Sequence, residues 1–173
     1  PATAAAAVAA ATAAAAALRL QTMGGELAIE GWRVRAVSHF PTVRLAGVAL
    51  GANEGRWYYE VVLLTDGLMQ IGWADAGFEC DPLGGQGCGD HAHSYAFDGF
   101  RQKKWCVSSS PYGERWRMGD VLGVLLDLDN REIRFTLNGN DFGAGFVDFK
   151  ASSYDSQART RAAGGRRRAG AGA

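Results

Sequence analysis

The sequence predicts an all-β fold, and three observations indicate this class. Several short stretches alternate apolar and polar side chains, which is the period of a β-strand. Glycine-containing turn pairs, such as Asp66-Gly67 and Asn138-Gly139, lie between these stretches. Glycine is abundant, at 24 of 173 residues, and five tryptophans are available for aromatic packing. A chain of this length can form one domain with a sizeable core.

The most regular stretch is 121–137, which we expect to form two strands joined by a polar turn at 129–132. Apolar residues occupy alternate positions of both strands, so each strand turns one face to a core. These inward positions are Leu122, Val124, Leu126, Leu128, Ile133, Phe135 and Leu137. Asn138-Gly139 then supplies the positive φ angles that a type I′ turn needs. This stretch is scaffold, so functional residues are expected on the loops around it.

Other strands are expected at residues 42–46, 48–50, 57–64, 68–74 and 94–97. We expect Asp66-Gly67 to make the third and fourth of these a hairpin. Gly72 would leave space for a large aromatic ring from a neighbouring strand. Trp32 is expected at the edge of the core, and residues 108–111 are expected to form a loop.

Charge and cysteine content exclude several classes of protein. The 18 lysines and arginines balance 18 acidic residues, so no overall field favours nucleic acid as a partner. Three cysteines are too few for a disulfide framework and fit a reducing compartment, so we expect a cytoplasmic location. No stretch is apolar enough for membrane insertion. Because the chain begins with Pro1, we expect it to be a processed or excised piece of a longer protein.

Composition divides the chain into three parts. Residues 1–26 form an alanine-rich tail of low complexity, for which a transient helix is plausible and an organelle-targeting segment is the alternative. Residues 27–150 carry the strand patterns and form the domain. Residues 151–173 are rich in Ser, Ala, Gly and Arg, and we expect a disordered linker. A nuclear-import signal is the alternative for that basic tail.

Zinc is suggested by four residues: Cys80, Cys88, His91 and His93. Their spacing, C-x7-C-x2-H-x-H, differs from the usual ligand pairs two to four residues apart. Buried cysteines and exposed histidines are the favoured interpretation. Asp127 and Asp129 suggest calcium, but the glycine and distal glutamate of a calcium loop are absent. No nucleophile motif occurs either, so we predict no cofactor, no metal and no catalysis.

A group of cations at Arg101, Lys103 and Lys104 alternates with Phe100 and Trp105. Such interleaving is found in nucleic-acid interfaces. On a domain without net charge, a solvated strand edge that prevents sheet addition is the favoured interpretation. The sequence therefore predicts no nucleic-acid partner.

Five motifs occur in order: WYYEV, LMQIGWA, GCGD, SYAFDGFRQKKW and YGERWRMGDVLGVLLDLDNREIRFTLNG. Together they resemble a SPRY domain over roughly residues 43–149, most similar to those of RING-type E3 ubiquitin ligases and more distantly to those of ryanodine receptors. The resemblance implies a concanavalin-like sandwich of two twisted antiparallel sheets without a catalytic site. It also implies that Trp116 is a buried tryptophan and that Cys88 occupies an apolar core position.

SPRY domains bind peptides or protein surfaces through loops at one end, so the resemblance implies a non-catalytic protein-interaction module. It would serve a larger protein, such as a RING-type ubiquitin ligase, in substrate or partner recognition. The alternative is a structural domain packed permanently within a large assembly or channel. The implied binding face gathers loops near Arg44, the 84–90 segment, the 95–101 hairpin and Tyr112. Its partner-binding residues would be Arg44, Tyr95, Phe97, Asp98, Phe100, Arg101 and Tyr112. Arg44 and Tyr95 are preferred, with core packing as the alternative for Tyr95 and a bond within its own turn as the alternative for Asp98. The oligomeric state stays open.

Overall fold

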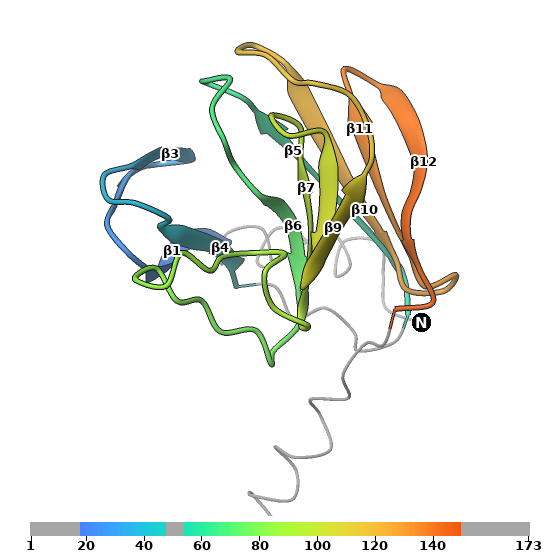
Figure 1. The fold of residues 1–173 in the computed structure, drawn as a ribbon, viewed down its shortest axis with the longest axis horizontal. Helices are drawn as coiled ribbons and strands as arrows, with labels where there is room; N and C mark the ends of the chain where they lie inside the picture. The colour runs from blue at the N-terminus through green and yellow to red at the C-terminus, as the bar shows by residue number, and fades with distance from the viewer. Residues whose placement is uncertain (1–17, 48–53, 150–173) are drawn as a thin grey trace, which may run out of the picture.

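The computed structural model describes residues 18–47 and 54–149, and their regular structure consists of β-strands alone. The predicted all-β class and the sandwich are therefore confirmed. Two four-stranded antiparallel sheets form the sandwich, and two short two-stranded ribbons lie at one side of it (Figure 1). No helix long and apolar enough to cross a bilayer occurs in these two ranges. The strand expected at 48–50 lies outside the described residues, as does the C-terminal tail.

The first sheet has the order β12-β11-β10-β5. Its strands are β5 (Arg56–Val62), β10 (Val121–Asp127), β11 (Glu132–Leu137) and β12 (Asn140–Val147). The predicted alternation is confirmed, because Leu122, Val124 and Phe135 are fully buried. Asn138 and Gly139 have φ angles of 51° and 82°, as expected for the turn between β11 and β12.

The second sheet has the order β6-β7-β8-β9. Its strands are β6 (Ile71–Ala74), β7 (Ser94–Asp98), β8 (Lys103–Cys106) and β9 (Ser108–Pro111). Two predictions were wrong here. The Asp66-Gly67 turn connects the two sheets instead of closing a hairpin, because β5 pairs with β10 and β6 pairs with β7. Residues 108–111 form the edge strand, so Lys103 and Lys104 lie on an inner strand and do not guard an edge.

The N-terminal ribbons pair β1 (Arg19–Gly24) with β4 (Thr42–Ala46) and β2 (Leu27–Glu30) with β3 (Arg33–Ala36). β1 lies inside the range 1–26 that we assigned to the alanine-rich tail, so part of that range is a strand of the ribbons. The expected role of Trp32 in the core was wrong, because this residue lies in the turn between β2 and β3 and is 66% exposed.

The core lies between the two four-stranded sheets. Its buried members are Leu63, Phe97, Trp116, Leu122, Val124, Leu126, Ile133, Phe135, Leu137 and Phe149. The Phe97 ring lies at the centre of an aromatic cluster and contacts the rings of Trp116, Phe135 and Phe142. Trp116 is fully buried, as the resemblance implied, and packs so closely over Gly99 that a Cβ there would lie 2.4 Å from the indole ring.

Gly72 permits a close approach of backbone, not of the aromatic ring that we expected. A Cβ at this position would lie 1.9 Å from the carbonyl oxygen of Tyr95 on β7. The Gly72 carbonyl in turn accepts a hydrogen bond from the Tyr59 hydroxyl at 2.7 Å. Tyr59 lies on β5, so this hydrogen bond joins the two sheets. Burial raises the pKa of the Tyr59 hydroxyl.

Candidate partner-binding site

Strand β7 separates two groups of loops at opposite ends of the second sheet. Its first residue, Ser94, follows the long connection 75–93, whereas its last residue, Asp98, begins the turn to β8. Figure 1 shows the long connection beside β1 and β4, and the turn after β7 at the other end with the connections that follow β5 and β9. The residues predicted to form one binding face are therefore divided between two ends of the sandwich.

A buried carboxylate fixes the turn 98–102. The Asp98 side chain is fully buried, and its Oδ1 accepts a hydrogen bond from the backbone N–H of Arg101 at 3.1 Å. Its Oδ2 accepts a second bond from Nε of the same arginine. A buried charge requires such partners, so Asp98 is bonded within its own turn, as the alternative interpretation held. Arg101 is held in one direction while 33% of its side chain stays exposed.

Two arginine–aromatic contacts flank this turn. The Arg101 guanidinium lies 4.0 Å from the centroid of the Trp105 ring. The Arg115 guanidinium lies 4.5 Å from the centroid of the Phe100 ring, and its Nη1 donates to the Phe100 carbonyl oxygen at 3.5 Å. Each contact is worth about 0.5–1 kcal/mol at an exposed site. These contacts favour the observed positions of Phe100 and both arginines at the surface, and the buried Asp98 holds Arg101 in addition.

Two neighbouring loops adjoin the turn and add apolar side chains. The Trp116 Nε1 donates to the Gly67 carbonyl oxygen at 3.2 Å, and the Gly119 N–H donates to the Leu63 carbonyl oxygen at 2.8 Å. The exposed apolar residues of these loops are Leu64, Leu68 and Met118. We name this surface the hairpin end and define it as residues 64–68, 99–102 and 114–119.

Sequence reasoning found Phe100 and Arg101 at the hairpin end but missed Leu64, Arg115 and Met118. Two of the missed residues stand beside turn signals that the sequence did show, the Asp66-Gly67 pair and the Gly119-Asp120 pair. An apolar residue next to a turn pair was therefore the usable signal. What the sequence could not show is that these turns lie at the same end.

Two of the predicted partner-binding residues are interior. Phe97 and Asp98 have no exposed surface, so neither can contact a partner directly, and this part of the prediction was wrong. The cause is their place on β7: Phe97 faces the core, and Asp98 anchors the turn.

Tyr112 and Tyr95 are partly buried, so their predicted partner contacts stay predictions. The Tyr112 hydroxyl donates to the Gly143 carbonyl oxygen at 2.7 Å, and burial raises its pKa to about 12. The Tyr95 ring contacts the rings of Phe146 and Phe149, as core packing would require, and burial raises its pKa too.

Arg44 lies on β4, which Figure 1 shows at the other end of the sandwich from the turn after β7. Its Nε and Nη2 donate to the Gln21 Oε1 at 3.1 and 2.8 Å, which ties the exposed arginine to β1. Thr42 on the same strand lies beside the predicted 84–90 segment, since a Cβ at Gly87 would be 3.6 Å from its hydroxyl. Arg44 and this segment therefore belong to the other end of the sandwich.

The four zinc candidates do not form a cluster. The Cys88 Sγ lies 3.9 Å from the Trp73 carbonyl oxygen, and burial raises the pKa of this thiol to about 12. His91 and His93 stack in a turn, not in a strand, and His93 Nδ1 pairs with the Asp75 carboxylate at 2.9 Å. Within residues 18–47 and 54–149 no three His, Cys, Asp or Glu side chains are arranged to hold a metal ion.

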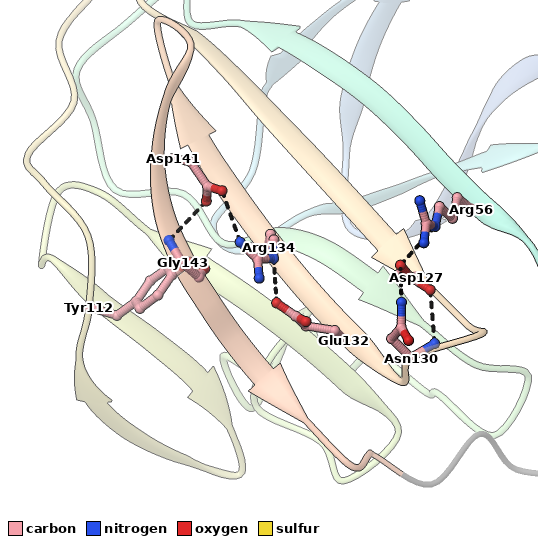
Figure 2. A network of polar contacts seen from close by, with 8 residues as sticks. All are labelled: Arg56, Tyr112, Asp127, Asn130, Glu132, Arg134, Asp141 and Gly143. Carbon is pink, nitrogen blue, oxygen red and sulfur yellow. Dashed lines mark hydrogen bonds and ion pairs between the residues drawn. The ribbon is translucent and has the colours of Figure 1, made fainter.

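Figure 2 shows the polar network that stiffens the first sheet. The Asp127 carboxylate accepts two hydrogen bonds of 2.9 Å from Asn130 and pairs with the Arg56 Nε at 2.9 Å, so it closes the β10–β11 turn. Arg134 bridges Glu132 and Asp141 across β11 and β12. Asp141 also accepts the Gly143 N–H at 2.8 Å, and the Gly143 carbonyl receives the Tyr112 hydroxyl. Through Tyr112, the segment that follows β9 and leads to the hairpin end is thereby bonded to β12 of the first sheet.

Arginine and aromatic side chains displayed together on the loops of a β-sandwich are the kind of surface that protein-interaction modules use. The family model described as SPRY domain matches residues 56–154, more than half of the chain, so this chain belongs to the SPRY domain family. The resemblance found in the sequence is confirmed. SPRY domains are protein–protein interaction modules and are generally non-catalytic.

Three curated relatives share this domain. The E3 ubiquitin-protein ligase RKP of Arabidopsis thaliana is 44% identical over 97 residues, which cover 56% of this chain and 7% of the relative. The ATP-dependent RNA helicase DDX1 of Xenopus laevis is 34% identical over 96 residues, which cover 56% of this chain and 12% of the relative. The ATP-dependent RNA helicase Ddx1 of Drosophila melanogaster is 32% identical over 94 residues, which cover 54% of this chain and 12% of the relative. The matched part is thus a small fraction of each relative.

Proposed function

We propose that this domain recognises a protein or a short peptide through its hairpin end, as the substrate- or partner-recognition part of a larger protein. A RING-type E3 ubiquitin ligase is the favoured parent, because the domain of a ubiquitin ligase shares 44% of the matched residues. Any ligase activity would reside elsewhere in that parent. The proposed location is the cytoplasm, in line with three free cysteines.

The observation that carries this proposal is the fixed pair of Phe100 and Arg115. Interfaces concentrate binding energy in a few aromatic and arginine side chains, and side chains that are already ordered lose less entropy on binding. Phe100 is 37% exposed and lies under the Arg115 guanidinium, with exposed Leu64 and Met118 on the adjoining loops. This arrangement suits a partner that brings both apolar and acidic groups.

The test is affinity capture from cell extract with the full chain as bait, read by mass spectrometry. A double variant, Phe100→Ala with Arg115→Ala, should lose partners that the wild type retains. The matched control, Leu83→Ala with Arg131→Ala, also removes one exposed apolar residue and one exposed arginine, but away from the hairpin end. Circular dichroism must show that both variants fold. Partners that survive the first double variant would contradict the proposal.

A structural domain within a large assembly is the second candidate function. Tyr58 and Val62 favour it, because both are more than half exposed on the outer face of β5. Permanent packing against a neighbour would cover such residues. A stoichiometric complex that resists dilution and is lost in Tyr58→Ser with Val62→Ser, but not in the hairpin-end variant, would favour this candidate instead.

A further inference from the structure

The N-terminal ribbons hold a pocket outside both the family match and the hairpin end. It lies between β1 and the turn that joins β2 to β3, and its volume is about 280 Å³. Its lining residues are Leu18, Arg19, Leu20, Ile29, Gly31 and Trp32. The indole of Trp32 is 66% exposed beside this space. A large aromatic residue left exposed beside a hollow that also contains other apolar side chains is a feature of interaction surfaces.

Part of the pocket wall is apolar because the β2–β3 ribbon has two different faces. In its register Leu27 lies opposite Ala36, and Ile29 lies opposite Val34, so one face of the ribbon is apolar. The other face carries the pairs Ala28 with Arg35 and Glu30 with Arg33. No apolar side chain of residues 18–47 is fully buried. The apolar face of the ribbon is thus incompletely covered in the described structure.

Charge indicates what kind of partner would cover it. Residues 18–47 hold four arginines and two glutamates, whereas residues 54–149 hold eight lysines and arginines and fifteen acidic residues. The ribbons are therefore the positively charged part of an otherwise acidic domain. The side chains of Arg19, Arg33 and Arg35 form no hydrogen bond or ion pair with any described residue. Arg33 and Arg35 lie on the other face of the ribbon, whereas Arg19 lines the pocket without a carboxylate beside it. Free arginines of this kind steer and hold acidic partners.

We propose that this pocket binds an acidic peptide segment of a partner protein. One apolar side chain of the segment would enter the space beside Trp32 and Ile29, and a flanking carboxylate would pair with Arg19. Small-molecule sites typically have volumes of roughly 300–1,000 Å³. A pocket of about 280 Å³ therefore suits a side chain of a longer ligand better than a complete small molecule.

The test uses the full chain, labelled with ¹⁵N, and two synthetic peptides followed by NMR. The first has a central leucine with three glutamates on each side, and the second has lysines in place of the glutamates. The acidic peptide should shift the indole N–H of Trp32, and the basic peptide should not. Trp32→Ala and Arg19→Glu should each weaken binding by about tenfold or more, as expected for an anchor residue.

Arg131→Glu is the matched control, because it changes the net charge equally at an exposed position on the β10–β11 turn. It should alter binding by less than about twofold, since exposed charges farther apart than a Debye length are largely screened.

Equal shifts with both peptides, or none at millimolar concentration, would overturn the proposal. Self-association that the same two variants abolish would make a second copy the occupant. Binding that appears only after removal of residues 1–17 would make that segment the occupant. Variants at Phe100 and Arg115 should leave this binding intact, so the two proposals can fail separately.

Discussion

The sandwich and the N-terminal ribbons are both antiparallel, but only the sandwich has a buried core. Phe97, Trp116 and Phe135 lose all exposure between the two sheets, whereas in the range 18–47 only Thr42 is buried, and it keeps 9% exposure. Two-stranded ribbons bury little surface and are marginally stable alone. The ribbons therefore depend on neighbouring segments, such as the long connection whose Pro82 and Cys80 side chains pack around Gly24.

This difference teaches that the two proposed binding surfaces have different physical bases. The hairpin end is attached to the core, because Trp116 packs on Gly99 and Asp98 anchors Arg101. The pocket beside Trp32 has no such support, so a ligand there would also stabilise the ribbons. Regions with few buried contacts open with lower free energy than the core. The predictions below use matched pairs of substitutions to test the contrast.

The largest effect is expected from replacing the same residue type in the two regions. Trp116→Ala empties a fully buried site and also removes the bond to Gly67, so the free energy of unfolding should fall by about 3–5 kcal/mol. Trp32→Ala removes an exposed side chain and should change the free energy of unfolding by less than about 0.5 kcal/mol. Urea unfolding followed by circular dichroism measures both. Similar losses for the two variants would show that the ribbons have a core of their own.

The strands that could be predicted are those whose pattern is local. Residues 56–62 and 132–137 alternate strictly between more and less covered positions, because one face of each strand meets the core. The strand 121–127 has an apolar residue at every second position, although its other face is also partly covered. This period is visible in the sequence itself. The partner of each strand is not local. β5 pairs with β10, about sixty residues later, and not with the strand beyond Asp66-Gly67. β9 consists of three serines and a proline, so no apolar pattern marks it.

The site was predictable only in part for the same reason. The family pattern indicated the turn after β7, and the structure places Phe100 and Arg101 there at the surface. Arg115 and Met118 join them because β9 and β10 bring the connection 112–120 to the same end. Arg44 was assigned to that face because it follows a strand entry that matches the family pattern, but its strand, β4, lies at the opposite end (Figure 1). Which loops lie at the same end of the sandwich depends on which strands pair, and a single sequence does not reveal that pairing.

A smaller effect is expected from adding a methyl group to a glycine of each region. In Gly72→Ala the Cβ would lie 1.9 Å from a β7 carbonyl oxygen, and backbone inside a sheet cannot move aside. The loss should reach the upper part of the overpacking range, about 3 kcal/mol. In Gly24→Ala the Cβ meets the Pro82 ring at 2.7 Å and the Cys80 thiol at 2.9 Å. The thiol can rotate, and the proline ring can move with the backbone of its irregular connection, which no sheet holds in place. That loss should stay below about 1 kcal/mol, and a larger one would show that the ribbon is packed as rigidly as the sandwich.

The smallest effect concerns acid, and it should be confined to the sandwich because no ion pair joins the described residues of the ribbons. The hydrogen bonds from Asn130, followed by the charge of Arg56, lower the pKa of Asp127 in the folded state. A carboxyl group with a lowered pKa stabilises the fold above its unfolded pKa of about 3.9, and this contribution is lost as pH falls through the folded value. Asp127→Asn should therefore lower the urea midpoint at pH 7, and the difference in midpoint from the wild type should narrow towards pH 3.

Asp66→Asn is the control, because Asp66 is exposed and forms no hydrogen bond or ion pair with a described residue. A difference in midpoint that stays constant with pH would mean that Asp127 acts through the shape of the β10–β11 turn and not through its charge.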